Sequence, residues 1–321
     1  MANTFTEPKS ASLKKNAIVV CCTASYLPYA AVTLLSCRDH GAADAADFHL
    51  IVPDATDEDE RKFLDFFASN SMQVHLHRVV IDPSAYQLEH NSFGVGAVLR
   101  LYLDQWISPR YERVLYLDSD ILAVGPVAAV FGIDLKGKSV GAVEDIVSIR
   151  RSNGLREQED YFQNLGLKPI SKYFNSGVLV FDWQAVVARR RLRNCIEKGL
   201  HMRAAGIKQK FADQDILNVE FENDWMPLNP RYNTMWFYAP HLATKPVFRH
   251  FAGVGKPWDE MLNPASLRYA RTYRNYLKGS PWQLPKRLKW KQHTEWLFRV
   301  HLLNMINFDM KRAVREQLPS K

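Results

Sequence analysis

The chain has 321 residues and a net charge of +8, with 47% hydrophobic and 24% charged residues. This composition is typical of a globular protein with a substantial core, and no apolar run approaches the roughly 20 residues that span a bilayer, so we expect a cytoplasmic protein without a transmembrane helix. The charge is uneven, because residues 268–321 hold 13 bases and three acids whereas residues 1–267 hold 29 bases and 31 acids.

Short apolar runs alternate with helical patterns through the first half of the sequence. This alternation is typical of a parallel sheet with crossover helices. Strands are expected at residues 17–22, 48–52 and 72–80. Helices are expected at residues 28–37, 57–68 and 95–106. Pro28 suits the start of the first helix, and the acids of "DATDEDE" suit the N-terminus of the second.

The second half continues the pattern and then changes in composition. Strands are expected at residues 113–118, 139–144, 177–182 and 246–252. The segment "WQAVVARRRLRNCIEKG", residues 183–199, predicts one helix that ends at Gly199. A change in composition near residue 260 separates one α/β domain, at 16–260, from a basic, aromatic-rich helical extension at 261–321. The polar residues 1–15 before the domain are expected to form a disordered tail.

The four cysteines offer no metal or disulfide pattern. They are Cys21, Cys22, Cys37 and Cys195, with no CxxC pair and no histidine at a ligand spacing. Inert thiols in a reducing compartment are therefore expected.

Two carboxylates, Asp118 and Asp120, interrupt the apolar segment "RVLYLDSDILAVGPV". Residues i and i+2 of an extended chain point to the same side, so this pair can present two oxygen ligands to one divalent cation. The Asp-x-Asp pattern also occurs at 57–59, where a helix N-terminus explains it, and at 213–215, where the acids could equally cap the following helix. Only Asp118 and Asp120 follow a buried strand, at the sheet edge where α/β proteins bind ligands.

A second polar segment, "FRHFAGVGKPW", spans residues 248–258. His250 ends an expected strand, Gly253 and Gly255 allow close approach of the backbone to a ligand, and Lys256 is a point charge suited to phosphate. A glycine-proline turn with a solvated lysine is the alternative.

Four segments in order resemble glycosyltransferase family 8, over roughly residues 16–260. They are "LRLYL", "VLYLDSDIL", "YFNSGVLVFD" followed by "ADQDILN", and "HFAGVGKPW". The resemblance implies a GT-A fold, which is a Rossmann-like, mostly parallel sheet flanked by helices. It also implies a retaining transfer of a hexose from a nucleotide diphosphate sugar.

The same resemblance implies roles for individual residues. Asp118, Asp120 and His250 would bind Mn²⁺, with Mg²⁺ as the alternative ion. A larger set of residues would contact the donor nucleotide and its diphosphate. These residues are Thr23, Tyr26, Arg100, Asp118, Ser119, Gly253, Gly255 and Lys256.

On the sugar side, Asn175, Asp213 and Gln214 would be the catalytic groups. Breaking a sugar-phosphate bond develops positive charge at the anomeric carbon, and carboxylate and amide oxygens stabilise such charge. Covalent attack by Gln214 and a front-face reaction both fit these residues.

One segment departs from the family pattern. Where the family has acids and asparagine before a tyrosine, this chain reads "CCTASY" at 21–26, so Tyr26 is in place but the acids are not. The resemblance implies UDP-glucose or UDP-galactose as donor, and the missing acids predict weakened recognition of the base.

The expected acceptor is a surface glycan or glycolipid, and the basic extension predicts association with an anionic membrane on its cytoplasmic face. A sugar-1-phosphate nucleotidyltransferase is the alternative enzyme, although "CCTASYLPYA" lacks the glycine-rich basic loop of that class. A nucleic-acid partner is not expected, because the excess charge is confined to the extension. The sequence does not specify the oligomeric state.

Overall fold

A computed structural model describes residues 14–88, 94–145, 155–168, 171–235, 244–253, 255–259 and 264–282. The tail expected at residues 1–15 lies outside this part up to residue 13, and the expected extension lies outside it beyond residue 282.

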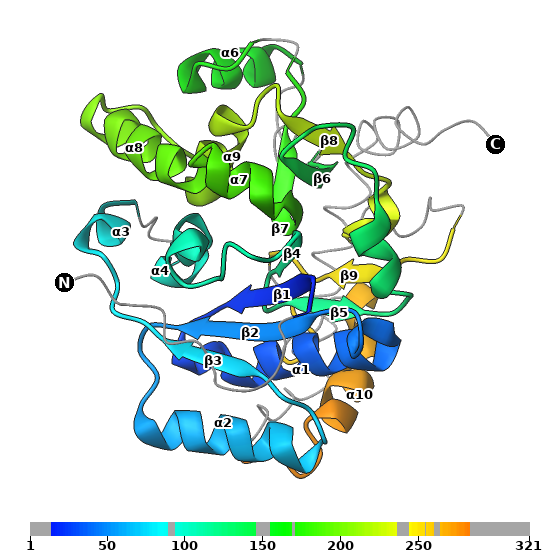
Figure 1. The fold of residues 1–321 in the computed structure, drawn as a ribbon. Coiled ribbons are helices and arrows are strands. Elements are labelled where there is room, and N and C mark those ends of the chain that lie inside the picture. Colours follow the sequence, from blue (N-terminus) through cyan, green and yellow to red (C-terminus); the bar gives the residue numbers. More distant parts are fainter. Residues whose placement is uncertain are drawn as a thin grey trace, which may run out of the picture.

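A seven-stranded sheet forms the centre of the described chain (Figure 1). In spatial order its strands are β3 (His75–Arg78), β2 (Asp47–Val52), β1 (Asn16–Cys21), β4 (Arg113–Leu117), β7 (Phe174–Asp182), β6 (Val140–Glu144) and β8 (Trp225–Pro227). Neighbouring strands are parallel except where β7 pairs with β4 and with β6. The expected mostly parallel sheet is thus confirmed.

Helices cover both faces of the sheet, and this explains why its central strands are apolar throughout. Ile18 and Val20 of β1 belong to a core shared with α1 (Leu27–Cys37) and α2 (Asp57–Ser69). Ala17 and Val19 belong to the core on the other face. The helices of that second layer include α3 (Pro83–Leu88), α4 (Gly94–Val98), α8 (Arg191–Ala204) and α9 (Ala212–Glu220). The described segments also include α6 (Leu155–Leu165).

Two of the expected helices differ in the structure. The expected helix at 183–199 is two helices, α7 (Trp183–Ala188) and α8, because Arg190 between them adopts a left-handed conformation with φ 52°. Gly199 does not end a helix. It lies inside α8, where an added Cβ would come within 2.8 Å of side chains of Leu88 and Ile216, so its role is close packing. The expected helix at 95–106 is α4 followed by a 3-10 helix at Leu99–Gln105.

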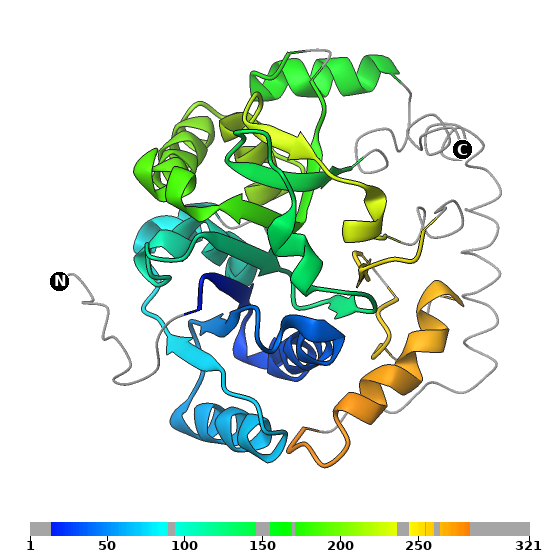
Figure 2. The same cartoon turned by 45° about the vertical axis from the view of Figure 1, so that its right-hand side comes forward.

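The described part of the extension packs on the main domain. Helix α10 (Pro264–Tyr276) lies beside α1 (Figure 2), and Tyr273 is buried in a cluster with Val32. Trp282 contacts the rings of Phe63 and Phe66 of α2. These aromatic residues therefore contribute to the fold.

Buried His49 of β2 and half-buried His75 and His77 of β3 form a histidine cluster. His49 Nδ1 lies 2.9 Å from His77 Nε2, and His75 stacks on the His49 ring. The other nitrogen of His49 lies 2.9 Å from the Tyr111 hydroxyl, which donates to Asp47 at 3.0 Å. Burial, together with the neighbouring imidazoles, lowers the pKa of His49 and of His77, the latter to about 4.

Acid should therefore unfold this protein through the histidine cluster. In the unfolded chain the imidazole of His77 has a pKa of about 6.5, whereas in the folded protein its pKa is about 4. The unfolded state therefore binds the proton first as the pH falls, and the free energy of unfolding decreases between these two values. We expect His77 to account for a loss of about 2 kcal/mol between pH 7 and pH 5. Denaturant unfolding at both pH values should show a smaller loss for His77→Gln than for the wild type. Replacing the exposed His201 by glutamine is the control, and an equal loss in the His77→Gln protein would contradict the assignment.

Candidate active site

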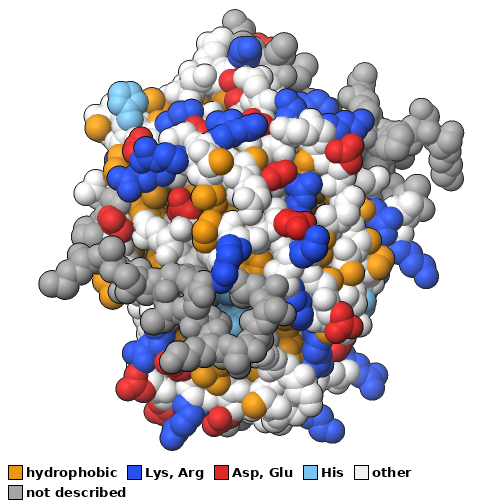
Figure 3. All heavy atoms as spheres, in the orientation of Figure 1, with side chains coloured by type: hydrophobic (Ala, Val, Ile, Leu, Met, Phe, Trp, Pro, Cys, Tyr) orange, Lys and Arg blue, Asp and Glu red, His pale blue; other side chains and the backbone are white. Residues whose placement is uncertain are grey.

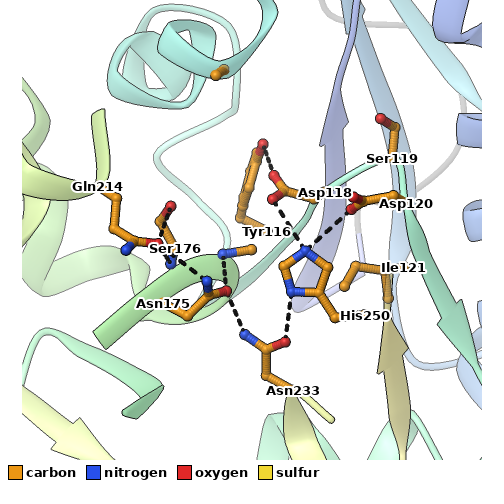
Figure 4. A network of polar contacts seen from close by, with 12 residues as sticks. Tyr116, Asp118, Ser119, Asp120, Ile121, Asn175, Ser176, Gln214, Asn233 and His250 are labelled. Atoms are coloured by element: carbon orange, nitrogen blue, oxygen red, sulfur yellow. Dashed lines mark hydrogen bonds and ion pairs between the residues drawn. The ribbon is translucent and has the colours of Figure 1, made fainter. Parts of the chain in front are cut away.

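Asp118 and Asp120 lie in the turn between β4 and β5 (Ile121–Ala123), at the carboxyl end of a central strand (Figure 4). The Asp118 amide donates to the Gly177 carbonyl at 2.9 Å, which ties this turn to β7. Strand β5 pairs antiparallel with β9 (Phe248–His250), and the register sets Ile121 opposite His250. This pairing gathers one ligand atom from each of Asp118, Asp120 and His250 within 4.8 Å of one another.

One oxygen of each carboxylate is paired with a cation, and the other faces His250. Asp118 Oδ1 lies 2.9 Å from an Arg100 nitrogen, and Asp120 Oδ2 pairs with the Lys256 ammonium. His250 Nε2 lies 3.8 Å from Asp118 Oδ2 and 3.3 Å from Asp120 Oδ1. Within the described part of the chain, the buried Asp120 Oδ1 accepts no hydrogen bond. Two carboxylate oxygens and an imidazole nitrogen suit a divalent cation, so these residues fit the expected metal.

Buried cations balance the carboxylates. Arg100 is only 5% exposed and also binds Asp213, through Nε at 3.0 Å. Burial opposes its charge, but the two carboxylates outweigh this and raise the pKa of Arg100 above its ordinary value. Burial would likewise raise the pKa of Asp120, but the adjacent Lys256 holds it well below its usual range. Both Asp120 and Arg100 are therefore charged at neutral pH.

Glycines make room around these groups. A Cβ added to Gly177 would lie 2.4 Å from His250 Cε1 and 2.9 Å from Asp118 Oδ2, so a side chain there would occupy the space between the ligands. Gly253 and Gly255 have φ of 81° and 78°, a left-handed backbone that favours glycine. These two residues precede Lys256 and turn the chain so that its ammonium reaches Asp120.

The expected sugar-side residues come together on β7 and at the start of α9. Asn175 Nδ2 donates to Asp145 at 3.1 Å and to Gln214 Oε1 at 3.2 Å. Gln214 Oε1 also accepts from the Ser176 amide at 3.0 Å. Burial raises the pKa of Asp213 to about 6, and the Arg100 guanidinium limits this rise. We call Asp118, Asp120, His250 and Lys256 the metal side of the site, and Asn175, Asp213 and Gln214 its sugar side. Arg100 links the two sides, because it binds both Asp118 and Asp213.

The expected base-binding segment follows β1, the strand that pairs with β4. Tyr26 is 40% exposed, and its ring meets the edge of Trp258, which follows Lys256 closely in the chain. Thr23 Oγ1 lies 3.0 Å from the Ser25 hydroxyl. An acid does reach this loop, because Asp54 Oδ1 accepts from the Ala24 amide at 2.7 Å. This carboxylate holds the loop backbone, and the weakened recognition of the base expected from "CCTASY" stays a prediction.

Two other aspartates of the Asp-x-Asp patterns, Asp59 and Asp215, have structural roles at helix N-termini. Asp59 forms a capping box with Thr56 at the start of α2. Asp215 accepts from the Tyr161 and Tyr173 hydroxyls, both at 2.6 Å, and from backbone amides that precede α9. Ser119, expected near the donor, lies between the two carboxylates with its side chain directed away from His250 (Figure 4).

Several polar residues of the site were not expected from the sequence. Tyr116 donates to Asp118 at 2.9 Å, and Asn233 lies between His250 and Asn175. The alternation of β4 could have indicated Tyr116, because it stands two residues before Asp118. Asn233 has no such local signal, since its segment reaches the site through contacts with β9 and β7, which are distant in the sequence.

Comparisons with known proteins find relatives over most of the chain. Residues 17–261 match the family model described as glycosyl transferase family 8. The lipopolysaccharide 1,2-glucosyltransferase of Escherichia coli is 26% identical over 298 residues, which cover 88% of this chain and 84% of that protein. The lipopolysaccharide 1,3-galactosyltransferase of Salmonella typhimurium is 22% identical over 249 residues, covering 74% and 70%.

A solved structure shows the same fold. The galactosyltransferase LgtC, in complex with donor and acceptor sugar analogues, superposes with a TM-score of 0.69 at 21% identity, over 84% of this chain and 98% of that chain. The likeness confirms the expected GT-A architecture. Among the residues that the structure describes, no helix has the length and apolarity needed to cross a membrane.

Proposed function

The chain belongs to glycosyl transferase family 8 and is a glycosyltransferase, and we propose that it is a metal-dependent, retaining hexosyltransferase. Its donor would be UDP-glucose or UDP-galactose. The observation that carries the metal requirement is the set of three converging atoms, Asp118 Oδ2, Asp120 Oδ1 and His250 Nε2. The nucleotidyltransferase alternative is not favoured, since the family match covers most of the chain.

The metal side of the site neutralises the leaving diphosphate. Asp118, Asp120 and His250 would hold Mn²⁺, which supplies a Lewis acid for the phosphate oxygens when bound. Lys256, held at Asp120, is close enough to the ligands to add a second positive charge toward the same phosphates. The backbone at Gly253 and Gly255 can approach the diphosphate closely because neither residue carries a side chain.

The sugar side orients the hexose and stabilises charge at its anomeric carbon. Asp213 and Gln214 present oxygens from the first turn of α9, and Asn175 supports Gln214 through its amide. These groups are preorganised, because the Gln214 oxygen already accepts from a backbone amide and Asp213 is fixed by Arg100. Tyr26, partly exposed, would stack on the nucleotide base.

The acceptor we propose is a growing surface glycan or a lipid-linked glycan. Relatives over most of the chain length are named for lipopolysaccharide glucosyl and galactosyl transfer. A glycan acceptor also agrees with the site, where the described polar residues provide hydrogen-bond partners for hydroxyl groups.

A donor panel tests the proposed function. The purified protein is incubated with Mn²⁺ and UDP, GDP and ADP hexoses, and the release of nucleoside diphosphate is measured with and without EDTA. We expect Mn²⁺-dependent release from a UDP-hexose. A nucleotidyltransferase would instead release pyrophosphate from a nucleoside triphosphate and a sugar 1-phosphate, and that result would refute the proposal.

We further propose that residues 261–321 associate with anionic membrane and bring a lipid-linked acceptor to the site. The excess of basic residues in this region supports the proposal, and the face of the main domain in Figure 3 carries basic and acidic side chains interspersed. Cosedimentation with vesicles containing anionic lipid tests it. Full-length protein should bind more strongly than a variant with Lys286, Arg287, Lys289 and Lys291 changed to glutamine, and equal binding would refute the idea.

A further inference from the structure

Asn233 is a fully buried amide between the metal side and the sugar side of the site (Figure 4). It follows a short 3-10 helix at Pro230–Tyr232, and its own amide donates to the Pro230 carbonyl at 3.1 Å. The next residue, Thr234, exchanges backbone hydrogen bonds with β9, giving to Phe248 at 3.0 Å and accepting from His250 at 3.1 Å. Asn233 is therefore fixed relative to the strand that carries His250.

A chain of hydrogen bonds determines which way the Asn233 amide points. The Gly177 backbone amide donates to Asn175 Oδ1 at 3.0 Å, and a backbone N–H can only donate. Asn175 Oδ1 is therefore an acceptor, and the Asn233 atom 2.8 Å from it must be the NH₂ group. The Asn233 oxygen then faces His250 Nδ1 at 2.9 Å.

The orientation of Asn233 in turn sets the tautomer of His250. An amide oxygen accepts only, so Nδ1 of His250 carries a hydrogen, and the neutral form of the ring then has its lone pair on Nε2. That lone pair faces Asp120 Oδ1 and Asp118 Oδ2 at 3.3 and 3.8 Å. With the hydrogen on Nε2 instead, the ring would donate to a carboxylate, and the position for a cation would be closed.

We propose that Asn233 is a positioning residue that holds His250 in its metal-binding tautomer. The proposal deepens the proposed function and rests on it for the identity of the ion. Asn233 also couples the two halves of the site, because its NH₂ group binds the same Asn175 oxygen that the Gly177 amide binds. The hydrogen-bond chain runs from the backbone of β7 to the metal ligand, so the lone pair points at the carboxylates before an ion binds.

The tautomer can be measured without metal or substrate. Long-range ¹H–¹⁵N spectra of ¹⁵N-labelled, metal-free protein distinguish hydrogen on Nδ1 from hydrogen on Nε2, and the His250 signals are assigned by their loss in His250→Gln. We expect the hydrogen on Nδ1 in the wild type. The spectra are recorded at a pH where the ring is neutral, and hydrogen on Nε2 there would overturn the proposal even if no variant of Asn233 folds.

Two variants then test the consequence for metal binding, with Mn²⁺ alone as the probe. Asn233→Leu removes both side-chain hydrogen bonds at similar volume, and we expect its Kd for Mn²⁺ to rise about 10–100-fold with loss of the Nδ1–H signature. Thr234→Val is the matched control, because it removes a buried hydrogen bond to Pro230 in the same segment without touching the His250 ring. It should bind Mn²⁺ like the wild type.

The outcomes separate the two proposals. Wild-type Mn²⁺ affinity in a folded Asn233→Leu protein would refute the role of Asn233 while leaving the transferase function intact. If the wild type itself binds no Mn²⁺, the metal requirement of the proposed function fails, and the tautomer spectrum still reports whether Asn233 sets the state of His250.

Discussion

Asp120→Asn should abolish metal-dependent sugar transfer while the protein remains folded. Both oxygens of Asp120 take part in the site: Oδ1 faces His250 and has no donor among the described residues, and Oδ2 pairs with Lys256. An amide removes the negative charge that binds the ion and leaves Lys256 without its counter-ion. Loss of a group that only supports a metal ligand costs 10–100-fold, so we expect loss of a direct ligand to lower kcat by more than about a hundredfold.

The matched control is the same substitution in another Asp-x-Asp pattern. Asp57 stands at the N-terminus of α2, is paired with Arg78 at the surface and lies away from the site, so Asp57→Asn should keep full activity. Donor hydrolysis is measured for both variants over a range of Mn²⁺ concentrations, and thermal unfolding checks that each is folded. Wild-type turnover by a folded Asp120→Asn protein would refute the role of Asp120 as a metal ligand. Wild-type activity that EDTA does not change would refute it as well.

The second large effect is expected from a single methyl group at Gly177. The Cβ of alanine would lie 2.4 Å from His250 Cε1 and 2.9 Å from Asp118 Oδ2, distances that real contacts do not show. The imidazole has little freedom to move away, because Asn233 holds its other side at 2.9 Å. The ligands must therefore separate, and a displacement of about 1 Å in an active site costs on the order of a hundredfold in rate.

Gly177→Ala should therefore lower kcat/KM for the donor about a hundredfold and weaken the binding of Mn²⁺. Gly132 provides the control, because a Cβ there meets nothing within 4 Å and the residue is exposed. Activity and Mn²⁺ affinity are compared for Gly177→Ala, Gly132→Ala and the wild type. If Gly177→Ala matches Gly132→Ala in both, then His250 and Asp118 do not act together at one ion.

The sequence was informative wherever structure depends on neighbours in the chain. Apolar runs such as residues 17–22 predicted β1 because a strand buried on both faces needs side chains of one kind at every position. The i and i+2 spacing of Asp118 and Asp120 predicted a shared side because it depends only on the local backbone. The order of four motifs indicated the family, and the match over residues 17–261 confirmed it.

Only the tertiary structure decided how distant segments meet. The pairing of β5 with β9 places His250 beside the carboxylates, and no local pattern specifies that register. The expected helix at 183–199 breaks at Arg190, whose left-handed backbone is not visible in the helical spacing that continues through it. Asn233 and Asp54 joined the site by contacts with residues far away in the sequence. Periodicity reports which face of an element is buried, whereas a site is assembled from several elements whose relative positions are set by the packing of the whole core.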